Sequence, residues 1–168
     1  MKQAFAPINL KITVVESVIT ALAASAAVLS ELPIWAMFVG WIAYFTRGLD
    51  LRHGLINLGC VMIGLCLGIG AASVLGSLGR PPGLGEQAAV VFGVALIVLS
   101  LRFLPVFNNL LGFFLGLVAW FAAHLPPGAA GLMTLAGAAT LGSLAGWIAH
   151  SLQRRLAHPA GAGPAHSN

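Results

Sequence analysis

The run GLINLGCVMIGLCLGIGAASVLGSL, residues 54–78, contains no charged side chain. A bilayer core of about 30 Å needs about 20 residues of α-helix, so this run is long enough to cross it. The run ends at residues 79–83, GRPPG, where proline and glycine stop a helix. We therefore interpret residues 54–78 as a transmembrane helix and read the flanking sequence for others.

Five further apolar stretches are separated by short polar or Pro-Gly segments. The six predicted spans cover residues 12–30, 33–46, 54–78, 87–101, 105–125 and 129–152. Pro33 and Pro105 each suit a first helical turn, where the missing N–H needs no partner. The sequence thus predicts an all-α, polytopic membrane protein. Its single six-helix domain is residues 1–156, and residues 157–168 are predicted to be a disordered cytoplasmic tail.

Composition supports the membrane class. The chain is 59% hydrophobic and only 7% charged, whereas a soluble domain has about 25% charged residues. Its eight Lys and Arg residues lie singly between apolar stretches, so we expect the lipid bilayer as partner and no nucleic acid. Four acidic residues, no clustered histidines and no catalytic motif predict no enzyme, no catalytic residue, no metal and no cofactor.

The basic residues also predict how the chain is threaded. Six alternating spans leave seven basic residues on one side, namely Lys2, Lys11, Arg47, Arg52, Arg102, Arg154 and Arg155, and only Arg80 on the other. Basic residues are retained on the cytoplasmic side, so both termini are predicted to be cytoplasmic. The alternative is that the first stretch is a cleaved secretory signal. Glu16 within it, and a second apolar segment soon after it, argue against that reading.

Two sequence matches suggest an internal repeat. Leu32-Pro33 and Gly40-Trp41 recur 72 residues later as Leu104-Pro105 and Gly112-Phe113, and Gly64/Gly68 recur 78 residues later as Gly142/Gly146. Two three-helix halves would enter the membrane from opposite faces, giving an inverted repeat of the kind found in transporters. The alternative is coincidence, because Leu, Pro and Gly are common in this chain.

Small residues mark the predicted helix-packing faces. Glycines four apart share one face of a helix and allow two backbones to approach closely, which favours helix association in lipid. The candidate packing residues are Gly40, Gly64, Gly68, Gly112, Gly116, Gly142 and Gly146. Packing within the chain and packing between copies both fit this pattern. We expect a homo-oligomer, since six short helices enclose little space.

A few polar side chains within or near the spans are candidates to line a water-accessible path. They are Glu16, Thr20, Asn57, Asn108 and Asn109. Thr13, Glu16, Thr20, Ala23 and Ala27 fall on one stripe by their three- and four-residue spacing. A carboxylate in a span usually faces the bundle interior or a water path. The alternatives are that Glu16 is solvated at the interface and that the asparagines satisfy backbone groups near helix starts.

The stretch WAMFVG, residues 35–40, continues to Ala43-Tyr44-Phe45 and a Gly/Leu/basic turn. With the Phe103-Leu104-Pro105 segment and Gly142/Gly146, it resembles the bacterial family of domain of unknown function 1097, the YcdZ-type small inner-membrane proteins. The resemblance covers most of the chain up to about Leu156. It implies a small multi-pass protein of the bacterial inner membrane, and it supplies no functional residues.

These observations give two functional hypotheses. The first is a small-solute channel or transporter built from two inverted three-helix units, with an unknown substrate. Its motivation is the repeat together with the Glu16 stripe. The second is a non-transporting scaffold or accessory subunit that binds a partner through the glycine-rich helix faces.

Overall fold

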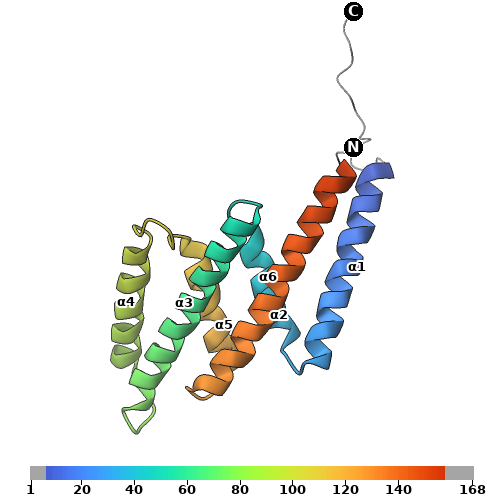
Figure 1. Cartoon of the computed structure of the whole chain (residues 1–168). Coiled ribbons are helices and arrows are strands. Elements are labelled where there is room, and N and C mark those ends of the chain that lie inside the picture. The colour runs from blue at the N-terminus through green and yellow to red at the C-terminus, as the bar shows by residue number, and fades with distance from the viewer. Residues whose placement is uncertain (1–6, 158–168) are drawn as a thin grey trace, which may run out of the picture.

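The computed structural model describes residues 7–157, and this part of the chain contains six α-helices and no strand (Figure 1). The helices are α1 (Pro7–Leu29), α2 (Ile34–Phe45), α3 (Leu51–Gly76), α4 (Leu84–Leu101), α5 (Leu110–Ala123) and α6 (Ala129–Ala157). The predicted all-α class with six helices is confirmed. Lys2 lies outside the described residues. So does the predicted tail, apart from Ala157, which ends α6.

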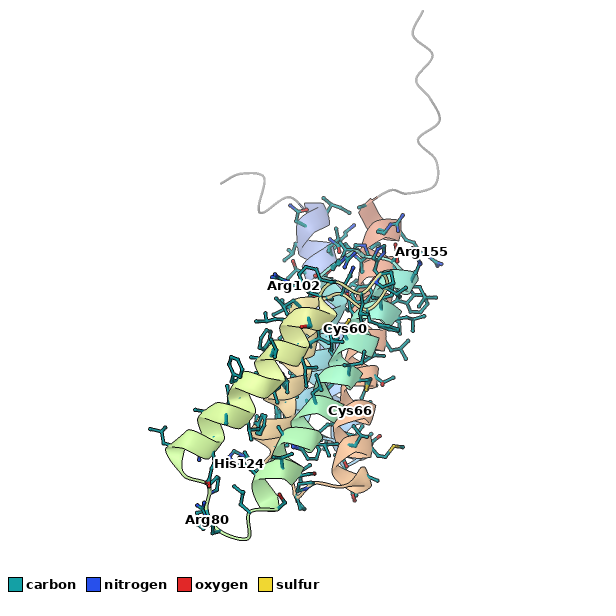
Figure 2. All side chains as sticks on the ribbon, turned by 90° about the vertical axis from the view of Figure 1, so that its left-hand side faces the viewer. Cys60, Cys66, Arg80, Arg102, His124 and Arg155 are labelled. Atoms are coloured by element: carbon teal, nitrogen blue, oxygen red, sulfur yellow. The ribbon has the colours of Figure 1, made fainter. Side chains whose placement is uncertain are left out.

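Successive helices run in alternating directions, so the α2–α3 and α4–α5 connections lie at the same end of the bundle (Figure 1). The start of α1 and the end of α6 lie at that end too. Arg102 and Arg155 are found there, whereas Arg80 is at the opposite end (Figure 2). The alternation that the charge pattern requires is therefore present in the fold.

Four helices form the centre of the bundle and two flank it. The main core cluster joins α2, α3, α5 and α6, with Trp120 and Leu65 among its buried residues. On one side α1 packs against α6 and α2, and on the other α4 packs against α3 and α5. Because α1 and α4 bury few residues, most of their apolar surface faces outward.

Four helices, α1, α3, α4 and α6, are long and apolar enough to cross a membrane by length and composition. The central helices α2 and α5 are apolar but shorter, with 12 and 14 residues. At 1.5 Å per residue these correspond to about 18 and 21 Å. Irregular backbone at their ends is tolerable at membrane depth where other helices cover it.

Two helices begin one turn earlier than the apolar runs predict. α3 starts at Leu51 rather than residue 54, because the Asp50 carboxylate caps it and accepts the backbone N–H of His53 at 2.7 Å. α4 starts at Leu84 rather than residue 87. There the Glu86 carboxylate accepts the backbone N–H of Gly83 at 2.7 Å. In both cases polar capping extends a helix beyond its apolar stretch.

The fifth helix begins five residues later than predicted. Pro105 does not open it, because the backbone from Phe103 to Asn109 is not helical. The helix starts at Leu110, where the Asn109 side chain accepts the backbone N–H of Gly112 at 3.3 Å. A side-chain cap therefore determines this start, and the proline belongs to the preceding connection.

The two halves of the chain repeat each other in an inverted arrangement. The starts of α1, α2 and α3 (7, 34 and 51) recur at α4, α5 and α6 (84, 110 and 129), shifts of 77, 76 and 78 residues. The buried residues of α2, namely Ala36, Met37, Gly40, Ala43 and Tyr44, correspond at the 76-residue shift to Gly112, Phe113, Gly116, Ala119 and Trp120, all buried in α5. Since α1 and α4 run in opposite directions, the halves are related by an approximate two-fold axis (Figure 1).

The glycine contacts obey the same relation. An added Cβ on Gly142 would overlap the Met37 carbonyl and one on Gly64 the Phe113 carbonyl. The other matched pairs are Gly40 on Ala139 with Gly116 on Val61, and Gly146 on Tyr44 with Gly68 on Trp120. Gly112 approaches Cys60. All seven candidate packing glycines therefore lie in contacts between helices of this chain.

The register of α2 against α5 differs by one helical turn from the sequence match. That match aligned Gly40 with Gly112, whereas the contacts align Gly40 with Gly116. The reason is that the two prolines are not equivalent. Pro33 is the residue before α2, but its counterpart before α5 is Asn109, and Pro105 lies in the connection. The 78-residue shift between α3 and α6 agrees with the sequence match.

Candidate functional site

Two of the predicted polar residues meet at one end of the bundle. The Asn109 side-chain amide donates to Asn57 Oδ1 at 2.8 Å and to Thr46 Oγ1 at 2.6 Å. Asn57 in turn donates to the Arg47 carbonyl at 2.8 Å and the Tyr44 carbonyl at 3.4 Å. Asn57 is fully buried, and these bonds use its amide and its oxygen.

The third predicted asparagine extends this network to the surface. Asn108 Oδ1 accepts a hydrogen bond from the Arg47 guanidinium, and Thr46 donates to the Ala43 carbonyl at 2.7 Å. The network therefore joins the α2–α3 connection to the start of α5, that is, one half of the chain to the other. Because Asn57 and Asn109 are buried and bonded to protein groups, they act as a structural clasp rather than a lining.

Glu16 and Thr20 lie elsewhere, in a groove between α1 and α2. This groove, the glutamate groove, has a volume of about 520 Å³. Its lining residues are Thr13, Glu16, Ser17, Thr20, Ala21, Ala24, Phe38 and Trp41. The sequence placed Thr13, Glu16 and Thr20 on one stripe, and they share this groove. Further along α1, Ala23 and Ala27 of the same stripe are buried in a cluster with Met37 and Ala145.

The hydroxyl groups of the glutamate groove present oxygen lone pairs. Each donates its proton to the backbone carbonyl four residues earlier: Thr13 to Asn9, Ser17 to Thr13 and Thr20 to Glu16, at 2.8–2.9 Å. With those protons used, what remains for a ligand is hydrogen-bond acceptors. Together with the Glu16 carboxylate they form a surface that suits a cation or a donor-rich solute.

The inverted repeat places a second groove opposite the first. It lies between α3, α4 and α5, measures about 540 Å³ and is lined mainly by Val, Ala, Leu and Phe side chains. Its Phe114 and Leu117 correspond to Phe38 and Trp41, and its Val90 and Val94 correspond to Thr13 and Ser17. By the same shift the counterpart of Glu16 is Gly93. The halves share a shape, but only one groove carries a carboxylate and hydroxyl groups.

The aromatic side chains behave differently from one another. Trp41 lines the glutamate groove, whereas Trp120 is buried in the core at 2% exposure. Phe38, which the sequence did not single out, closes the groove beside Trp41. Its signal was its position three residues before Trp41, on the same face of α2. Thr46, also not singled out, joins the asparagine clasp, and only the fold brings it there.

Among residues 7–157 no group of three or more His, Cys, Asp or Glu side chains is arranged to hold a metal ion. The ion pairs recorded for this part of the chain are peripheral. Arg80 pairs with Glu86, and Asp50 pairs with His53 at 2.8 Å. The His53 backbone N–H and ring both donate to Asp50, and they hold the pKa of its carboxyl below the ordinary value. Glu16 forms no ion pair within these residues.

Six alternating helices, four of them long and apolar, define a protein of the multi-pass membrane type. Residues 10–153 match the family described as "Protein of unknown function (DUF1097)", and the chain belongs to that family. No curated protein matches the chain, and no solved structure does either. The resemblance drawn from the sequence is confirmed, and the family adds no activity.

Proposed function

We propose that the chain is a homo-oligomeric protein of the bacterial inner membrane that carries a small cationic or donor-rich solute along the glutamate groove. Both termini face the cytoplasm, following the distribution of Lys and Arg. The observation that carries the proposal is the groove itself, in which one carboxylate and three hydroxyl groups gather on the membrane-facing part of α1.

The position of Glu16 gives this arrangement its meaning. Glu16 is eight residues beyond Ile8, the first residue of the apolar span in α1. At 1.5 Å per residue this is about 12 Å into the span. A carboxylate at that depth costs free energy and is typically retained for ion or substrate binding. The half-buried Glu16 therefore favours a functional site over an accidental one.

The difference between the two grooves points the same way. An inverted repeat with a polar site is the plan of many transporters, which supports transport by fold-level analogy. Here the polar groups occur only on the α1 side, while the matching positions of α4 are apolar. Packing alone does not require this difference, since the apolar groove is stable without it. Selection for a ligand at Glu16 accounts for it.

A second copy of the chain completes the path. The centre of a single chain is filled by Met37, Tyr44, Phe113 and Trp120, all buried, so the path does not run between the halves. The glutamate groove lies instead on the outer flank, between α1 and α2. A neighbouring copy that covers this flank would shield the carboxylate from lipid and enclose the solute.

The alternative function, a scaffold that binds a partner through glycine faces, has less support. Each candidate packing glycine contacts another helix of the same chain, so these faces are occupied. A scaffold would have to use another surface. The scaffold remains an outcome of the test below, recognised by a stoichiometric foreign protein that copurifies in mild detergent.

Flux into reconstituted vesicles tests the proposal. The probes are Na⁺, K⁺ and methylammonium under an imposed membrane potential, with protein-free vesicles as blank. We expect the wild type to carry at least one probe and Glu16→Gln to slow it about tenfold, as the loss of roughly 1.4 kcal/mol of binding would. Glu31→Gln is the control, because Glu31 lies in the α1–α2 turn outside the groove. Equal flux in Glu16→Gln and wild type, or no flux of any probe, would overturn the proposal.

A further inference from the structure

A second polar hollow lies at the end of the bundle where α6 ends. Its volume is about 570 Å³, and it sits between the α2–α3 connection and the last turns of α6. The residues that line it are Leu49, Asp50, Leu51, Trp147, His150, Ser151, Arg154 and Arg155. Figure 2 shows Arg155 at this end of the molecule, the same end as Arg102. We call it the arginine hollow.

The arginine hollow is suited to an anion. Arg154 and Arg155 are exposed in the last turn of α6, and no carboxylate of residues 7–157 pairs with either. Asp50 is the one acidic lining residue. Its carboxylate is bound by the backbone N–H and ring of His53, which is not a lining residue. The Ser151 hydroxyl and the His150 ring add polar groups to the same wall.

An apolar groove continues from the arginine hollow toward the middle of the bundle. It runs between α3 and α6 and has a volume of about 140 Å³. Its lining residues are Tyr44, Leu51, Gly54, Leu55, Leu58, Thr140, Ser143, Leu144 and Trp147. Leu51 and Trp147 line both spaces, so the two are continuous. A charged compartment joined to an apolar one has the shape of a site for an amphiphile.

We infer that the arginine hollow and this groove together bind an anionic glycerophospholipid of the surrounding bilayer. Its phosphate contacts Arg154 and Arg155, and part of an acyl chain lies along α3 and α6. Basic hollows between membrane helices recognise acidic headgroups through charge. Trp147 at the junction fits the level at which tryptophan meets the headgroup region. Free phosphate would leave the apolar groove uncovered, which is why a lipid is the better occupant.

The two parts of this site come from different halves of the chain. Leu55 and Leu58 belong to α3, whereas Trp147, Arg154 and Arg155 belong to α6. A lipid bound here bridges the last helix of each half. Bound lipid should therefore stabilise the assembled protein as well as occupy its surface. This inference is independent of transport, since it shares no residue with the glutamate groove.

Native mass spectrometry of the delipidated, full-length protein in detergent tests the inference. The probes are dioleoyl-phosphatidylglycerol, dioleoyl-phosphatidylcholine and inorganic phosphate. We expect the wild type to bind the glycerol lipid about 30-fold more tightly than the choline lipid, the effect of two basic residues at an anionic headgroup. The double variant R154Q/R155Q should lose this preference. Arg102→Gln is the control, because Arg102 is exposed at the same end but outside the hollow.

A groove variant separates lipid from free phosphate. Leu55 is 61% exposed in the wall of the apolar groove, so Leu55→Trp fills the groove without disturbing the core. We expect it to weaken lipid binding and leave Arg154 and Arg155 in place. Equal binding of the two lipids by the wild type would overturn the inference. A preference unchanged in R154Q/R155Q, or displacement of the lipid by inorganic phosphate, would overturn it too.

Discussion

At the scale of single residues, the buried polar groups divide into those with partners and one without. Asn57 and Asn109 complete their bonds within the clasp. The Tyr44 hydroxyl is buried and has no hydrogen-bond partner among residues 7–157. A buried hydroxyl without a partner costs free energy, so Tyr44→Phe should leave the free energy of unfolding unchanged or raise it by about 1 kcal/mol. Thermal unfolding in detergent, followed by tryptophan fluorescence, measures the difference.

Asn57→Leu is the matched comparison, because it removes a buried polar side chain that has its partners. It strands the Asn109 amide and the Arg47 carbonyl, and we expect the free energy of unfolding to fall by about 1–3 kcal/mol. Should Tyr44→Phe be as destabilising as Asn57→Leu, the hydroxyl of Tyr44 must be bonded in the native protein.

The sequence located some of these residues and missed their relationships. The stripe through Glu16 follows from spacing within one helix, and it identified the groove wall on α1. The contact between Asn57 and Asn109 joins positions 52 residues apart. It depends on where α5 begins, and that start is set by the Asn109 side chain rather than by Pro105. Local patterns cannot supply a distant partner, so a clasp looked like a lining.

At the scale of helices, glycine sets how closely α2 approaches α6 and α3 approaches α5. In Gly142→Ala the new methyl group would overlap the Met37 carbonyl, and in Gly64→Ala the Phe113 carbonyl. Because backbone yields less readily than a side-chain tip, each variant should lower the free energy of unfolding by about 1–3 kcal/mol. The inverted repeat predicts similar losses in the two, measured by thermal unfolding in detergent.

Gly93→Ala is the control for these glycine variants. Gly93 lies within α4, and an added Cβ there meets nothing within 4 Å. Alanine favours the helix over glycine by about 1 kcal/mol, so this variant should be neutral or more stable. A loss in Gly93→Ala as large as in Gly142→Ala would mean that the helix contacts are not what the glycines provide.

Helix number and type were predictable, and helix ends were less so. Apolar runs predicted six helices because lipid and core both demand apolar side chains. Asp50 and Glu86 extend α3 and α4 outward through capping, which hydropathy does not record. The same limitation moved the register of the repeat by one turn. It was anchored on prolines that occupy different positions relative to α2 and α5.

At the scale of the whole molecule, the two halves are interlocked rather than placed side by side. The most extensive helix pairings are α2 with α6 and α3 with α5, and each joins one half to the other. Within a half, α1 touches α2 only lightly, as α4 touches α5. Sequence could suggest two halves, since like patterns recur, but not which helices of one half contact the other.

This interlocking predicts how the halves behave when the chain is cut. Cleaving the gene in the loop at 79–83 gives fragments with three helices each, and neither contains its own main packing partner. Expressed together, they should assemble and copurify through a tag on one fragment, because both major interfaces can still form. Expressed alone, each should be degraded or aggregate, since its glycine faces have no helix to cover them. Adding Gly142→Ala to the second fragment should weaken copurification, whereas Gly93→Ala should not. A half that accumulates alone as a stable, monodisperse protein would show that the interlocked core is not required for folding.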